Sequence, residues 1–80
     1  MEELNLIFLR GGDVLLSNKS YKDWKEIQDE YEDYMTSMEF DSLEELSDFI
    51  QFEYRLSAKR AKSELQKLTT SSQTTVKIEL

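Results

Sequence analysis

The sequence predicts an α+β protein: a three-stranded, mainly antiparallel sheet with two helices packed across one face, in the order ββααβ. Three observations lead to it. An apolar run of strand length is followed by Gly11-Gly12, the middle of the chain carries apolar residues at helical spacing, and apolar and polar residues alternate near the C-terminus. Eighty residues are enough for one domain with a small core, so residues 1–80 are expected to form a single domain.

A β-hairpin is predicted over residues 4–18. The stretch 4–9 is almost continuously apolar, and Gly11-Gly12 favours a two-residue turn of the primed type. That turn places Leu9 opposite Val14. The apolar residues then divide between two faces, with Ile7, Leu9, Val14 and Leu16 on one and Leu6, Phe8 and Leu15 on the other.

Both faces of this hairpin are apolar, but two helices cover only one face of a sheet. A large uncovered apolar patch is unusual on a soluble monomer. Two remedies are open: a homodimer that pairs the uncovered faces, or a segment after Ser57 that folds back over the second face.

Residues 21–38 are predicted to form an amphipathic helix with Ser20 as its N-cap. At 100° per residue its apolar stripe falls within an arc of roughly 140°. The stripe consists of Tyr21, Trp24, Ile27, Tyr31, Tyr34, Met35 and Met38. Trp24, Ile27, Tyr31 and Met35 are expected in the core, whereas Tyr34 lies at the edge of the stripe and is expected to contact a partner.

A second helix is predicted over residues 43–68, with Ser42 as its N-cap and Glu45 completing a capping box. Uninterrupted, it would be about 39 Å long at 1.5 Å per residue. A compact domain of this size spans only around 30 Å. A break near Ser57 is therefore expected. The last element is a strand over residues 75–80, with Val76, Ile78 and Leu80 on one face.

The composition argues against an enzyme and against a cofactor. The chain has no cysteine and no histidine, which removes disulfides, thiolate nucleophiles and the commonest general base and metal ligand. The carboxylates between Asp29 and Asp33 lack the glycine of a calcium-binding loop, so no metal site is expected. No run of about 18 apolar residues is present, so no membrane contact is expected. The opening Met1-Glu2-Glu3 lacks a basic region, and a cytoplasmic location is expected.

Negative charge is concentrated in the middle of the chain. Residues 22–48 contain eleven carboxylates and two lysines. A folded surface of this kind binds a basic protein or imitates a polyanion, and it repels nucleic acid itself. The predicted contact residues are Glu26, Asp29, Glu30, Asp33 and Tyr34 on the first helix, with Asp41, Glu44, Glu45 and Asp48 as a second patch.

The segment 55–67 is basic instead, with Arg55, Lys59, Arg60, Lys62 and Lys67 against Glu64 alone. Two interpretations stay open for it. The cations either contact phosphate groups or complement the dipole at the C-terminal end of the helix.

Small size, acidity and the ββααβ order together resemble phage-encoded inhibitors of the anti-CRISPR type. The residues that carry this resemblance are the acidic stretches 23–33 and 39–45. The resemblance implies a non-enzymatic inhibitor, in the host cytoplasm, whose nucleic-acid-like surface blocks the basic nucleic-acid-binding site of a defence nuclease or complex. The alternatives are a toxin or bacteriocin immunity protein, similar to the barstar type in its C-terminal strand, and a self-associating regulatory or assembly adaptor.

Overall fold

The computed structural model describes residues 4–70 and 72–79. The elements follow one another as β1 (Leu4–Leu9), β2 (Val14–Ser17), α1 (Trp24–Glu30), β3 (Tyr34–Phe40), α2 (Leu43–Tyr54), α3 (Ala58–Thr70) and β4 (Thr75–Ile78). The strands form one antiparallel sheet in the order β3-β1-β2-β4. The α+β class is confirmed, whereas the expected three strands and ββααβ order differ from the observed four strands and ββαβααβ order.

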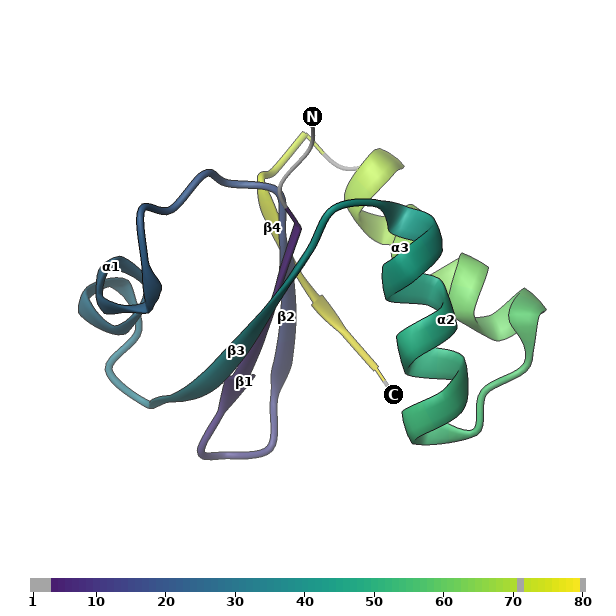
Figure 1. The fold of residues 1–80 in the computed structure, drawn as a ribbon, viewed down its shortest axis with the longest axis horizontal. Helices are drawn as coiled ribbons and strands as arrows, with labels where there is room; N and C mark the ends of the chain where they lie inside the picture. Colours follow the sequence, from purple (N-terminus) through teal and green to yellow (C-terminus); the bar gives the residue numbers. More distant parts are fainter. Residues whose placement is uncertain (1–3, 71, 80) are drawn as a thin grey trace.

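The sheet lies between helices on both faces (Figure 1), with α1 on one side and the pair α2 and α3 on the other. The larger core lies under α2 and α3 and is centred on Leu6, Leu16, Leu46, Ile50 and Leu65. The smaller core lies under α1 and consists of Ile7, Leu9 and Ile27 with the flanking residues Leu15, Tyr21, Tyr31 and Tyr34.

The second face of the hairpin is therefore covered by α1. The segment after Ser57 does not fold back over it, because α3 packs on the opposite face against α2 and β4. The apolar patch that suggested a homodimer is likewise buried within the chain. Self-association stays a prediction, but this reason for it no longer holds.

The hairpin register differs by one residue from the predicted one. Phe8 lies opposite Val14, and the loop contains the three residues 10–12. The Leu9 amide donates to the Asp13 carbonyl (3.0 Å), and the Gly12 amide donates to the Leu9 carbonyl (3.0 Å). Gly12 has a φ of +94° and Gly11 does not have a positive φ, whereas a two-residue type I′ turn needs a positive φ at both glycines. Because side chains alternate along a strand, this shift moves Val14 and Leu16 to the face of Leu6 and Phe8.

The predicted helix over residues 21–38 is wrong in its second half. Helix α1 ends at Glu30, Tyr31 has extended backbone, and Tyr34–Phe40 forms β3. The physical reason lies in β1, which is buried on both faces and needs hydrogen-bonding partners on both edges. β3 supplies the second edge by pairing along the whole of β1.

The start of α1 also differs, since Asp23 rather than Ser20 is the N-cap, with its carboxylate accepting from the Lys25 amide (2.9 Å). Of the four side chains expected in the core, Ile27 is buried and Tyr31 is partly buried. Trp24 and Met35 are 52% and 58% exposed, respectively.

The start of α2 matches its predicted capping box. The Glu45 amide donates to the Ser42 hydroxyl (3.2 Å), and the Asp41 amide donates to the Glu45 carboxylate (3.3 Å). The long helix breaks as its length suggested. Arg55 ends α2 in the left-handed conformation, and the Ser57 hydroxyl accepts from the Arg60 amide (3.2 Å) at the start of α3.

The C-terminal strand β4 pairs with β2. The Thr75 hydroxyl donates to the buried Ser17 hydroxyl (2.9 Å), which fixes the start of this pairing. Val76 and Ile78 face the larger core as predicted. Leu80, expected on the same face, lies outside the described residues.

Candidate binding surfaces

The acidic ridge expected on the first helix is divided between two elements. Glu26, Asp29 and Glu30 are exposed on α1, whereas Asp33 lies in the turn that follows it. Tyr34 is the first residue of β3 and is half-buried, with its hydroxyl 3.0 Å from the Ser37 hydroxyl. A continuous helical ridge of four carboxylates with Tyr34 beside it is therefore not formed.

Two of these carboxylates interact within the chain. The Glu30 carboxylate accepts from the Tyr21 hydroxyl (2.8 Å) and pairs with the Lys19 ammonium (3.1 Å). The hydrogen bond from Tyr21 and the nearby Lys19 charge hold the pKa of Glu30 below its usual value, although partial burial opposes them. Burial and the bond to Glu30 raise the pKa of Tyr21. Glu26 accepts from the Lys22 amide and so supports the start of α1.

Three acids of the second predicted patch, by contrast, share one side of α2. Glu44, Glu45 and Asp48 are exposed on the side of α2 opposite the buried Leu46 and Ile50. Asp41 is also exposed, two residues before the helix begins. The three ion pairs within the described ranges join Lys19 to Glu30, Lys67 to Glu64 and Lys77 to Asp13. None of them neutralises this patch.

Phe52 lies on the same outer side of α2 and is 81% exposed. It follows Asp48 by four residues, so the two side chains are neighbours on one helix face. A ring this exposed buries little apolar surface within the chain, and aromatic residues are enriched in the centres of protein interfaces. Phe52 was not among the contact residues predicted from the sequence. The available signal was its position off the buried stripe of Leu46 and Ile50.

The two acidic surfaces lie on opposite sides of the molecule. Helix α1 covers one face of the sheet and α2 lies on the other face (Figure 1). One flat partner surface therefore contacts only one of them at a time. Of the nine predicted residues, the structure groups Glu26, Asp29 and Glu30 on α1, and groups Asp41, Glu44, Glu45 and Asp48 at α2.

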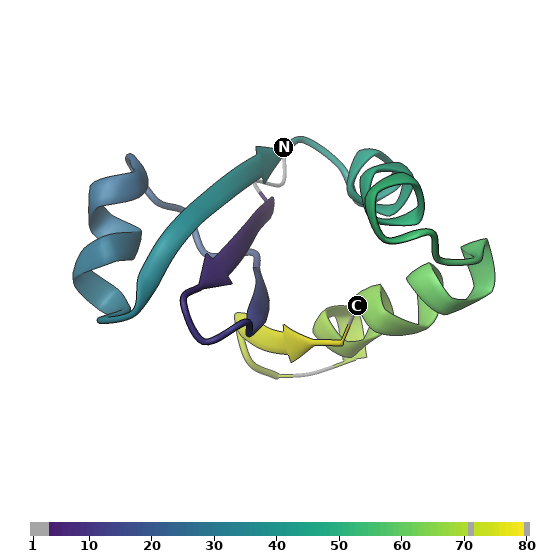
Figure 2. The same cartoon turned by 90° about the horizontal axis from the view of Figure 1, so that it is seen from below.

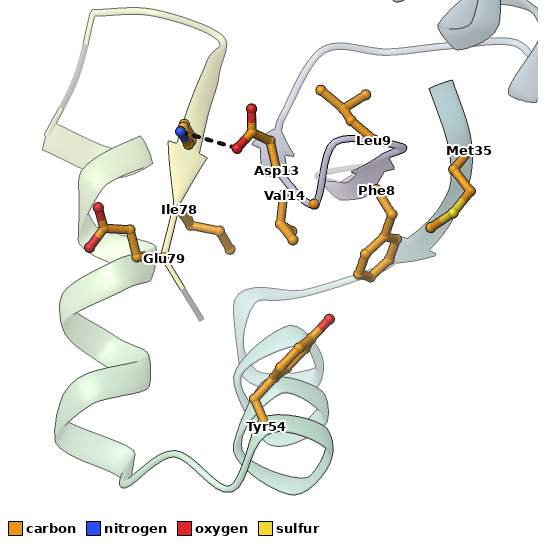
Figure 3. Close-up of a pocket in the computed structure, with 10 residues that line it drawn as sticks. Phe8, Leu9, Asp13, Val14, Met35, Tyr54, Ile78 and Glu79 are labelled. Carbon is orange, nitrogen blue, oxygen red and sulfur yellow. Dashed lines mark ion pairs between the residues drawn. The ribbon is translucent and has the colours of Figure 1, made fainter. Parts of the chain in front are cut away.

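Two open cavities lie on the α2 side of the sheet. One, of about 430 Å³, is bordered by Phe8, Val14 and Met35 from the strands and by Tyr54 from the end of α2 (Figure 3). Burial and the neighbouring Glu53 charge raise the pKa of Tyr54. The other, of about 450 Å³, lies between α2 and α3, with Leu43, Leu65 and Lys62 in its lining.

The basic segment lies mainly on α3, where Lys59, Arg60 and Lys62 are exposed. Lys62 and the acidic Glu44 border the same cavity between the two helices. Lys67 pairs with Glu64 at 2.8 Å near the C-terminal end of α3. These positions leave both interpretations of the basic segment open.

No group of three carboxylates within residues 4–70 and 72–79 is arranged to hold a metal ion. In the same part of the chain, no helix combines the length and the apolar character needed to cross a bilayer. Comparisons with protein families, with characterised proteins and with solved structures gave no match.

Proposed function

We propose that this protein is a non-enzymatic inhibitor that binds the basic nucleic-acid-binding site of a partner protein through the outer face of α2. The contact surface consists of Asp41, Glu44, Glu45 and Asp48, with Phe52 beside them. We refer to these five residues as the α2 surface. The observation that carries the proposal is the exposure of Phe52 on a helix face whose carboxylates have no ion-pair partner within the described residues.

The charge arrangement supports a basic partner. Like charges at i,i+4, such as Glu44 and Asp48, destabilise a helix by a few tenths of a kcal/mol. The helix dipole favours Glu44 and Glu45 in the first turn of α2, whereas Asp48 lies beyond that turn. Carboxylates about 5–6 Å apart repeat negative charge at a spacing comparable to that of successive phosphates. A cationic groove that binds nucleic acid therefore attracts this surface as well.

Phe52 gives the surface an apolar centre. Exposed charges contribute mostly to the association rate and to partner choice, whereas a buried aromatic side chain slows dissociation. Under this proposal Phe52 enters an apolar hollow beside the partner's cationic groove. The carboxylates of the α1 side, Glu26, Asp29, Glu30 and Asp33, lie on the opposite side of the molecule and take no part in this contact.

To test this proposal, the immobilised chain is used to capture partner proteins from a lysate of the cells in which it acts. The lysate is first treated with nuclease, so that partners are not retained through nucleic acid. The wild-type chain is compared with the Glu44→Lys/Asp48→Lys variant and with the matched variant Asp29→Lys/Asp33→Lys. We expect a nucleic-acid-binding protein to be retained by the wild type and by the α1-side variant, and lost with the α2 variant. Equal capture by all three folded proteins contradicts the proposed surface.

A further inference from the structure

The outer edge of β3 is not paired with any strand in the described ranges. β3 is the terminal strand of the order β3-β1-β2-β4, and Figure 2 shows it as the outermost strand on that side of the sheet. β3 spans Tyr34–Phe40, and over residues 36–40, where the pairing with β1 is regular, backbone N–H and C=O groups of alternate residues point away from β1. Such an edge accepts a further strand unless charge, proline or a covering element prevents pairing.

One face of β3 presents exposed methionine side chains. Met38 lies opposite Leu6 on the α2 side of the sheet and is 40% exposed, and Met35 borders the cavity that contains Phe8 (Figure 3). Met35 and Met38 are three residues apart and share this face because Met35 is the extra residue of a bulge, where the pairing with β1 shifts between Phe8 and Leu9. A strand added beside β3 would bring apolar side chains next to these two methionines. Their flexible thioethers pack against apolar groups of varied shape.

The other face of β3 borders a hollow of about 250 Å³ beside α1. Trp24, Asp23, Ser37 and Glu39 contribute to its lining, and Lys22 is the cation in it, so the charged side chains of the lining sum to a net negative charge. An exposed indole next to two carboxylates attracts a cation through the ring face and through charge. The chain's own Lys25 ammonium already lies 5.9 Å from the centroid of the Trp24 ring. The two faces of this edge therefore favour different side chains, cationic toward α1 and apolar toward α2.

The strand that pairs with the free edge of β3 could come from a second copy of the chain or from a basic protein, and the charges near this edge favour the basic protein. In a two-fold antiparallel pairing of two β3 strands centred on Ser37, the flanking Asp33 of one copy and Asp41 of the other would come near each other just beyond both ends of the paired strands. Like charges directly opposite one another destabilise a strand pair. A cationic strand meets carboxylates at the same positions and is stabilised by them.

We propose that β3 binds an extended segment of a basic protein as a fifth strand, with lysine or arginine alternating with apolar residues. The backbone of β3 supplies the hydrogen bonds, Trp24 and Glu39 attract the cations, and Met35 and Met38 contact the apolar residues. The inference rests on the proposed function only for the positive charge of the partner. It uses a surface separate from the α2 surface.

The probe is a synthetic peptide, Lys-Val-Lys-Val-Lys-Val-Lys, with blocked ends, titrated into the full chain at low salt. Amide chemical shifts and amide hydrogen exchange are measured by NMR. One control peptide has the same sequence with N-methylated alternate residues, which removes strand pairing but keeps the charge. A second replaces lysine by glutamate. The protein variants are Glu39→Lys, at the hollow, and Asp29→Lys, a matched charge reversal outside it.

We expect the lysine peptide to shift and protect the β3 amides, with at least about 10-fold weaker binding of both control peptides, because several backbone hydrogen bonds or charge contacts are lost. Glu39→Lys weakens binding by a similar factor and Asp29→Lys does not. Equal binding of the N-methylated peptide, or shifts confined to the α2 surface, overturns the proposal. Shifts confined to the α2 surface would still agree with the proposed function. The proposed function is contradicted by a different result, namely partner binding that is unchanged by charge reversal on α2.

Discussion

The carboxylate of Glu64 on α3 accepts a hydrogen bond from the backbone amide of Glu79, next to the end of β4, at 2.7 Å. The same carboxylate oxygen accepts from the Lys67 ammonium at 2.8 Å. Burial alone would raise the pKa of Glu64, but the bonds from Lys67 and Glu79 and the charges of Lys67 and Arg60 outweigh it and lower the pKa. A buried acid therefore holds the last described strand against α3.

This contact predicts a pH dependence of stability. A carboxylate whose pKa is lower in the folded state stabilises the fold above its unfolded-state value of roughly 4.3, and this contribution is lost as pH falls through the folded-state pKa. We expect Glu64→Gln to lower the free energy of unfolding at neutral pH by about 1–2 kcal/mol. The acid-induced loss of stability should also become smaller. Urea unfolding across the acid range measures both, and an unchanged pH profile in the variant contradicts this role.

The hairpin loop gives a second prediction with a control in the neighbouring residue. Gly12 has a φ of +94°, which a side chain disfavours, whereas Gly11 does not have a positive φ. No atom lies within 4 Å of a Cβ at either position, so crowding does not distinguish them. We expect Gly12→Ala to cost about 1–2 kcal/mol and Gly11→Ala to be close to neutral. Equal effects in thermal unfolding would mean that the loop is not the observed three-residue one.

The smaller core predicts how α1 is held. Ile27 is 2% exposed and is the buried residue of α1, against Ile7 and Leu9. Ile27→Ala should cost about 2–4 kcal/mol, as truncation of a buried aliphatic side chain does. Ile27→Glu should detach α1 and uncover the apolar face of the hairpin, so that the variant self-associates.

Sedimentation of Ile27→Glu beside wild type measures this effect, with Gln28→Glu as an exposed control on the same helix. A monomeric, stable Ile27→Glu protein would mean that α1 does not cover the second face. If the wild-type protein is already dimeric, the homodimer expected from the sequence is correct, although it must then use a surface other than the hairpin face under α1.

Local signals predicted the α2 and α3 region well. The capping box of Ser42 and Glu45 marked the start of a helix, and the length limit indicated a break near Ser57 that a second serine cap then stabilises. These features depend on hydrogen bonds between residues a few positions apart. They could therefore be identified without knowledge of the rest of the fold.

The residues from Tyr31 to Phe40 could not be assigned in this way. Tyr31, Tyr34, Met35 and Met38 fit a helical stripe, but the pairing of this segment with β1 depends on residues about 30 positions earlier in the chain. The hairpin register was missed because Gly11-Gly12 fits either loop length. The acids of the candidate surface on α2 could be identified from the sequence alone. The 81% exposure of Phe52 could not, because it depends on which side of α2 packs into the core, and the buried Leu46 and Ile50 show that side only in the structure.

Partner binding should depend steeply on salt. The Debye length is about 10 Å at 0.1 M ionic strength and about 3 Å at 1 M, so exposed carboxylates lose their long-range attraction over this interval. We expect the association rate to fall by about 10-fold or more, with a smaller change in the dissociation rate, which the proposal assigns to Phe52. Surface plasmon resonance separates the two rates. Phe52→Ala should give the opposite pattern, with faster dissociation and nearly unchanged association.

Under the proposed function, the α2 surface occupies a site where the partner binds nucleic acid. The most direct measurement is a competition experiment in which a labelled nucleic acid is bound to the captured partner and the chain is added stepwise. We predict that one equivalent of wild-type chain or of Asp29→Lys/Asp33→Lys displaces the nucleic acid, and that the Glu44→Lys/Asp48→Lys variant does not. A stable ternary complex of partner, nucleic acid and wild-type chain would contradict the claim.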